Sequence, residues 1–222
     1  MRLRNTILAA GAVLAVCATS SLAQSTLGPI TTSTPIPSTL TDWTGSLAFA
    51  QFNPSLGTLD SVTLEFSSTL TTTLTINNTA SSASSGSAKT ELQVTVQDAG
   101  LNLNVPELDM LSPAFNYVLG PGGFTTSGLL TKSANDGGNN YTAAGVLAEF
   151  TGLGSISLPA STFTQTDLSN TGGNTSASQV TDASLTGTVE YFYTPTAVPE
   201  PSTLGLLVLG LGMLPFRRRQ RQ

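Results

Sequence analysis

The sequence predicts an all-β protein, a single antiparallel β-sandwich of the jelly-roll type, on three observations. Segments such as 61–66 and 91–96 alternate apolar and polar residues, which is typical of strands with one buried face. Gly-, Asn- and Pro-containing turns, as at 53–57, separate such segments. No stretch of 24–198 sustains a 3.6-residue period, so we expect any helix to be short. A body of about 150 residues is long enough to bury one core.

The strands predicted most clearly lie at 59–76, 91–96 and 180–193. Each of them places apolar residues at every second position, so one face of each strand should be buried. The residues expected to face the core are Val62, Leu64, Phe66, Leu70, Leu74, Ile76, Leu92, Val94, Val96, Leu185, Val189 and Tyr191.

Between these strands the pattern is less regular. Residues 77–88 and 165–178 are rich in Ser, Thr, Asn and Gly and predict loops, and 135–140 predicts a polar hairpin tip. Residues 146–150 and 153–158 predict two further strands around Gly152 and Gly154.

The N-terminus has the three parts of a secretory signal peptide. Arg2 and Arg4 precede an apolar segment at 7–18, and the small-x-small site at 21–23 predicts cleavage between Ala23 and Gln24 by signal peptidase. Leu14-Ala15-Val16-Cys17 is an alternative lipoprotein site, although Val16 is bulky for that position. Ordinary cleavage removes Cys17, the only cysteine, and leaves a mature chain without a thiol.

Residues 24–41 allow two interpretations. They are rich in Ser, Thr and Pro, and Pro35 and Pro37 favour an extended backbone, so the segment could be a linker. Alternatively, Ile30 to Thr34 adds an edge strand to the sheet that follows.

Charge is strongly one-sided between the two terminal segments. Residues 24–198 hold 12 acidic residues and only Lys89 and Lys132 as bases, a net charge of −10. Such a surface repels nucleic acid and anionic membranes.

The composition also excludes several catalytic chemistries. The chain has no histidine and loses its cysteine, which excludes Ser-His-Asp, Cys-His and His/Cys zinc sites. A Ser-Lys dyad would need Lys89 or Lys132, and both lie next to polar loops. Glu107 and Asp109 are the carboxylate pair that glycoside hydrolysis would require, but Pro106 favours an exposed turn. We therefore assign no catalytic residue and no enzymatic activity.

Two ligand classes stay open. Asp136, with Asn135, Asn139 and Asn140, and Glu107 with Asp109 offer hard oxygen ligands for calcium, although solvated loop residues have the same composition. No other cofactor is predicted. A carbohydrate would need aromatic side chains to stack against, and the candidates are Trp43, Tyr117, Tyr141 and Phe124.

The C-terminal tail combines a rigid motif, an apolar segment and a basic end. Pro199-Glu200-Pro201 precedes the apolar residues 203–216, and Arg217, Arg218, Arg219 and Arg221 follow. A helix over these apolar residues would rise about 21 Å, less than the roughly 30 Å of a bilayer core. It can span a membrane only if Pro201 and Ser202 are included and the arginines snorkel to the cytoplasmic surface.

This tail resembles the PEP-CTERM sorting signal of exported proteins in Gram-negative bacteria that make exopolysaccharide. The resemblance rests on Val198-Pro-Glu-Pro-Ser202, the short apolar helix and the terminal arginines, in this order. It implies processing at or near the motif by an exosortase, a membrane-embedded transpeptidase-like enzyme.

The body resembles a second family, the choice-of-anchor E domain. Residues 52–66 have the form Phe-turn-Gly-x-Leu-x-x-Val-x-Leu that opens that domain, and Gly187-x-Val-x-Tyr-x-Tyr193 has the form of its last strand. The resemblance implies a surface domain without established catalytic residues.

We therefore expect four segments: a signal peptide at 1–23, a linker or edge strand at 24–41, a β-sandwich at 42–195 and a sorting signal at 196–222. The predicted protein is exported to the cell surface or extracellular matrix, after transient anchoring in the inner membrane. Its expected role is structural or adhesive and linked to exopolysaccharide. The alternative is a carbohydrate-binding module, assisted by calcium.

Overall fold

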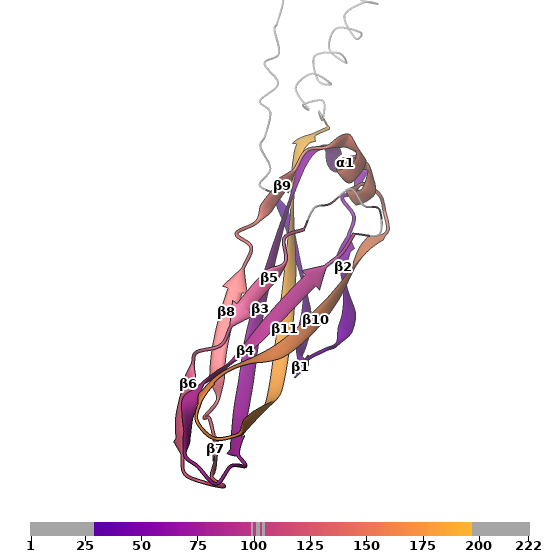
Figure 1. Cartoon of the computed structure of the whole chain (residues 1–222). Coiled ribbons are helices and arrows are strands. Elements are labelled where there is room, and N and C mark those ends of the chain that lie inside the picture. Colours follow the sequence, from indigo (N-terminus) through magenta and orange to yellow (C-terminus); the bar gives the residue numbers. More distant parts are fainter. Residues whose placement is uncertain (1–28, 99, 101–102, 104, 197–222) are drawn as a thin grey trace, which may run out of the picture. The chain divides into compact units, whose positions relative to one another are not determined.

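Two antiparallel sheets pack face to face in the part of the chain that the structure, a computed structural model, describes: residues 29–98, 100, 103 and 105–196 (Figure 1). The predicted antiparallel sandwich is confirmed. The chain divides into two units, and the sandwich is the unit Thr26–Thr196. The other unit, Met1–Ser25 with Ala197–Gln222, lies outside the described residues.

Sheet A is built on three long neighbouring strands. Its order is β1 (Ile30–Leu40), β11 (Thr175–Pro195) and β3 (Gly57–Asn78). Three short strands then line the other side of β3: β7 (Phe124–Thr126), β8 (Leu130–Asn135) and β9 (Asn139–Tyr141).

Sheet B is built in the same way, with three neighbouring strands and shorter strands along one side. Its order is β2 (Thr44–Ala50), β10 (Ser155–Thr171) and β4 (Ser84–Val96), and β5 (Leu108–Leu111) and β6 (Phe115–Leu119) pair with the far side of β4. β1 to β4 alternate between the sheets, whereas β5 and β6 stay in sheet B beside β4, and β7 to β9 lie in sheet A beside β3. Of the last two strands, β10 lies between β2 and β4, and β11 lies between β1 and β3. This wrapping of hairpins around two sheets is that of a jelly roll.

The core follows the alternation of β3, whose inward residues are buried along its whole length. The apolar residues divide into two clusters. The large cluster lies towards the helix α1 (Ala144–Phe150) and contains Leu64, Phe66 and Tyr191. The small cluster lies towards β6 and β7 and consists of Leu74, Ile76, Ala88, Tyr117 and Leu119. The predicted inward faces of the three clearest strands are confirmed.

Both predicted polar loops are much shorter than the sequence indicated. β3 continues to Asn78 and β4 begins at Ser84, while β10 continues to Thr171 and β11 begins at Thr175. These predictions were wrong because mostly small side chains occupy inward positions here: Ser84 and Ala88 are buried, and Ala177 packs partly buried against the small cluster. The apolar alternation that marks a strand is therefore missing.

The predicted strand at 146–150 is a short helix, α1. Val146 and Phe150, four residues apart, are its buried residues, which is helical spacing over a single turn. Of the other predicted strand, residues 155–158 lie in β10, and residues 153 and 154 immediately precede it.

Residues 30–40 form the edge strand β1, the second of the two interpretations of this segment. Ile30 lies opposite Tyr191 and Leu40 opposite Asp182, so the start of β1 is next to the end of β11. The turn before β3 has the expected chemistry: Asn53 accepts a hydrogen bond from the Ser55 N–H at 2.9 Å, and a 3-10 turn, Pro54–Leu56, follows.

Candidate functional site

The predicted processing sites lie outside the described residues. This holds for the cleavage site at Ala23 and Gln24, the motif Pro199-Glu200-Pro201, and the basic cluster of Arg217, Arg218, Arg219 and Arg221. The predicted apolar span at 203–216 lies outside them as well. Within the described ranges, the short helix α1 is far from the length of apolar helix that crossing a membrane requires.

The candidate calcium ligand Asp136 sits in a break between β8 and β9, and not at a hairpin tip as predicted. Both strands pair with β3 in the same direction, so 136–138 is an irregularity within one edge of sheet A. The Asp136 carboxylate accepts hydrogen bonds from the Phe66 N–H at 2.9 Å, the Gly138 N–H at 3.2 Å and the Asn139 amide at 2.9 Å. Asp136 and Asn139 are thus brought together as acceptor and donor, which orders the irregular edge.

The second candidate pair, Glu107 and Asp109, lies at the β4–β5 edge of sheet B. Glu107 accepts hydrogen bonds from the Gln93 side chain at 2.9 Å and the Thr95 hydroxyl at 3.3 Å. Asp109 is exposed on β5, opposite Gln93. Across the ranges 29–98 and 105–196 with residues 100 and 103, no group of three or more His, Cys, Asp or Glu side chains could hold a metal ion.

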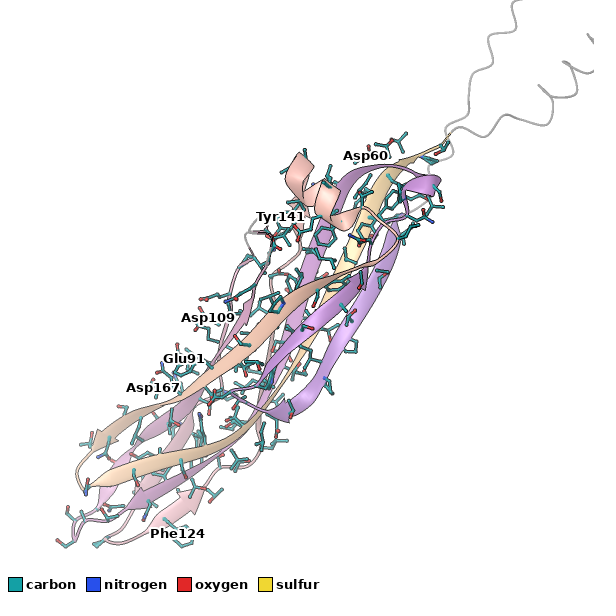
Figure 2. All side chains as sticks on the ribbon, turned by 90° about the vertical axis from the view of Figure 1, so that its right-hand side faces the viewer. Asp60, Glu91, Asp109, Phe124, Tyr141 and Asp167 are labelled. Carbon is teal, nitrogen blue, oxygen red and sulfur yellow. The ribbon has the colours of Figure 1, made fainter. Side chains whose placement is uncertain are left out.

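Two of the four candidate stacking residues have structural roles in the sandwich. The Trp43 indole N–H donates to the Ala183 carbonyl at 3.2 Å and the ring packs against the large cluster. Tyr117 is buried, with its hydroxyl directed at Asn170. Phe124 is 75% exposed, and Tyr141 is half-buried. Figure 2 shows Tyr141 near α1 and Phe124 at the opposite end of the sandwich, so they do not form a shared platform.

The environment of Tyr141 also differs from that of a free surface tyrosine. Burial raises the pKa of its phenol, and the nearby negative charge of Asp136 raises this pKa further. The phenol therefore stays neutral in the whole physiological range, as a ring packed beside the ordered edge around Asp136.

The outer face of sheet A is rich in hydroxyl groups, which sequence reasoning did not single out, with Asp182 and Val180 among them opposite Thr71 and Thr73. Thr69, Thr71, Thr73 and Thr75 of β3 alternate with its buried residues and therefore point outward. Their neighbours on the adjoining strands include Ser184, Ser178, Ser133 and Thr126. The regular Ser/Thr alternation could have indicated this face, because its period is two.

A groove at the opposite side of sheet A from β8 was also missed. It has a volume of about 380 Å³ and lies where β1 ends and β2 begins. It is lined by Leu40, Thr41, Asp42, Thr164, Gln179, Val180 and Thr181. No local sequence pattern indicates this groove, because the groove arises from the unequal lengths of neighbouring strands.

The fold and the tail together define a class of protein: a β-sandwich carried by a chain with a sorting tail. Residues 197–222 match the family model described as the PEP-CTERM protein-sorting motif. The predicted motif is therefore confirmed, and it implies an exported cell-surface protein that an exosortase sorts. This match covers the tail alone.

Comparison with whole proteins adds little. No curated protein matches the chain. Among solved structures, one titled "Structure of infectious bursal disease virus Gx strain" is 12% identical, with a TM-score of 0.19, and covers 96% of this chain and 54% of that chain. The chain thus spans about half the length of this viral structure, and a likeness at this TM-score carries no argument.

Proposed function

We propose that the sandwich is the non-enzymatic cargo of the sorting tail and has a structural or adhesive role in the cell envelope or exopolysaccharide matrix. Signal peptidase removes residues 1–23, the C-terminal helix holds the chain in the inner membrane for a time, and an exosortase then processes it. The observation that carries this proposal is the sorting motif at 197–222.

The hydroxyl-rich face of sheet A supports the matrix role. Uncharged hydroxyls both donate and accept hydrogen bonds, so they suit contact with hydrated, hydroxyl-rich polymers. Sheet B carries acidic groups on its outer face, where Glu91, Asp109 and Asp167 project outward (Figure 2). An acidic domain stays soluble outside the cell.

The proposal includes a choice-of-anchor E-like domain. The two glycines of its motifs have physical reasons in this sandwich. A side chain on Gly187 would meet Phe49 at 2.7 Å and Leu47 at 2.8 Å, in the large cluster. Gly57 has a φ of 155° and lies against the Thr194 carbonyl, where the first and last motif strands pair. Both motifs thus belong to one structural feature, the pairing of β3 with β11.

Intact mass spectrometry of the protein from its own host, in membrane and extracellular fractions, tests the proposal. We expect a species that begins at Gln24 and ends near 198–201. The variant P199A/E200A/P201A should retain residues 217–222 and stay in the membrane fraction, because the protease motif is gone. The matched control P106A/E107A changes the Pro-Glu pair of the body and should be processed like the unchanged chain. A mature species that keeps the arginines would make the tail a permanent anchor and contradict the proposal.

A carbohydrate-binding module, assisted by calcium, is the second candidate. The observation in its favour is Phe124, an exposed ring beside the hydroxyl-rich face, since Thr126 of the same strand pairs with Thr75. Measuring whether the purified protein is retained on the host's own polysaccharide, with and without calcium, tests this second candidate function.

A further inference from the structure

In the part of the chain that the structure describes, no strand pairs with one edge of β11 along its first six residues, Thr175 to Val180, which we call the open edge. β1 pairs with β11 only as far as Leu40 opposite Asp182, and the Thr41 N–H then donates to the Thr181 carbonyl at 2.9 Å. Figure 1 shows the β10–β11 hairpin continuing beyond the ends of β1 and β2. On its other side β11 pairs with β3 throughout.

The direction of the backbone groups on this edge follows from their neighbours. Gln179 lies opposite Leu74, whose own N–H and C=O bond to Ser127 on the far side of β3. In an antiparallel pair the backbone groups of such opposed residues point away from each other. The N–H and C=O of Gln179 therefore point away from β3, in the plane of the sheet, towards the open edge. By alternation the N–H and C=O of Ala177 point the same way.

The groove described above lies at the end of this edge and is lined in part by Gln179, whose side chain holds an unsatisfied acceptor. The side-chain oxygen Oε1 of Gln179 is buried from solvent and has no hydrogen-bond partner among the described residues. Buried acceptors without a partner are rare and costly. On the neighbouring edge of β10, Asp42 accepts a hydrogen bond from the Thr164 N–H at 3.0 Å, in the position that a strand would occupy. Asp42 covers Thr164 alone, because β2 pairs with β10 only as far as Ser161.

The open edge also lacks the usual protection against strand addition. Exposed edges are normally protected by charged residues, proline or bulges. The segment 174–181, Asn-Thr-Ser-Ala-Ser-Gln-Val-Thr, has no charge and no proline, and it pairs with β3 without a register shift. Beside it Leu40 and Val180 are each 63% exposed.

We propose that this edge binds an extended segment of another polypeptide as an added strand, continuing the line of β1. Backbone donors and acceptors at Ala177 and Gln179 define the ligand as an extended peptide, and rotation of the Gln179 side-chain amide gives its Oε1 a donor from the bound strand. The segment is uncharged along the edge and carries a Lys or Arg where it passes Asp42 and Asp182, in a body with a net charge of −10. This proposal makes the adhesive role more specific. It depends on the proposed function only for the location of the protein at the cell surface.

The test measures binding of a synthetic peptide, acetylated Lys-Thr-Val-Thr-Val-Thr amide, to the purified full chain by fluorescence anisotropy. The same peptide with N-methyl groups at alternate residues cannot pair as a strand, and a third peptide has Glu in place of Lys. We expect binding that weakens about tenfold or more with N-methylation, because several backbone hydrogen bonds are lost, and weakens less with Glu. Equal binding of the first two peptides, or no binding of the first, would overturn the proposal.

Two proline variants locate the site. Ala177→Pro removes an N–H that faces the open edge and spares the pairing with β3, so it should abolish binding and keep the fold. The matched control Thr166→Pro does the same at the open edge of β10 and should bind like the unchanged chain. If Ala177→Pro folds and binds normally, or if Thr166→Pro is the variant that loses binding, the assignment to β11 is wrong. Should Ala177→Pro not fold, protection of the 175–180 amides from hydrogen exchange by the peptide replaces it. Failure here leaves the sorting proposal intact, because the purified chain is tested without processing.

Discussion

The two halves of the sandwich are built from the same four long strands, but their interiors differ. Among the described residues, the half near α1 has a core cluster of 22 buried residues, and the half near β6 and β7 has one of 5. The large cluster contains aromatic contacts such as Phe52 with Tyr191, whose ring centroids are 6.0 Å apart. The small cluster instead adjoins buried polar groups. Continuous strands can thus hold two cores of unequal apolar content, because the backbone ladders run through both.

Hydrogen bonds replace apolar contacts in the half near β6 and β7. At its far tip the buried Asn78 side chain donates to the carbonyls of Ser82 and Gly120, and accepts from the N–H groups of Ala80 and Asn174. One side chain therefore links the three turns that contain Ser82, Gly120 and Asn174. Such bonds specify geometry but contribute little net stability, so we expect this half to open more readily than the other.

Two leucines of β3 provide the sharpest test of this difference. Leu64 in the large cluster and Leu74 in the small one are both fully buried on the same strand. Leu64→Ala should lower the free energy of unfolding by about 4 kcal/mol, and Leu74→Ala by about 2, because the smaller polar-lined core can relax around the cavity. Chemical denaturation of the two variants measures both values. Equal losses would mean that the two halves are packed alike.

Alkaline pH should destabilise the half near α1 in particular. Burial raises the pKa of Tyr191 to about 12, and its hydroxyl donates to the Ala50 carbonyl at 2.7 Å. In the unfolded chain a tyrosine ionises near pH 10, so above that pH the folded state holds more protons than the unfolded state. Stability is therefore full below pH 10 and falls as the pH rises through 10 to about 12, by up to about 3 kcal/mol.

The variant Tyr191→Phe isolates this effect. It should cost about 1 kcal/mol at neutral pH through the lost hydrogen bond, and its free energy of unfolding should fall less between pH 10 and 12. Denaturant titrations at pH 8, 10 and 11.5 compare the two chains. Parallel losses in both would assign the alkaline sensitivity to other groups.

The same difference between the halves explains what the sequence could and could not reveal. In the half near α1, inward residues such as Val62, Leu64 and Phe66 alternate with polar ones, and the predicted strands were confirmed there. In the other half Ser84, Ala88 and Ala177 take inward positions. Their alternation with other small polar residues has no hydrophobic period, so strands were mistaken for loops.

The candidate sites show a similar limit. The sorting tail could be predicted because it is a linear motif whose parts follow one another in the sequence. The environment of Asp136 could not, because the Phe66 N–H that binds it comes from 70 residues away in the chain. The open edge of β11 was equally hidden, since it depends on where β1 stops.

A buried cluster of threonines marks the boundary between the two cores and gives the smallest predicted effect. The Thr72 hydroxyl is 3.0 Å from that of Thr90 and 2.7 Å from that of Thr181, so it bridges the two sheets. Thr72→Val keeps the shape but leaves two buried hydroxyls without their shared partner, and should cost about 1–2 kcal/mol. The control Thr71→Val, on the outer face, should stay within about 0.5 kcal/mol.

Replacing the whole cluster should reverse the loss. In T72V/T90V/T181V no buried hydroxyl is left unpaired, and three methyl groups join the two apolar clusters. We therefore expect stability near that of the unchanged chain, and slower hydrogen exchange in the half near β6 and β7. A triple variant that costs the sum of its single changes would instead show that the hydroxyl bridge itself holds the two halves together.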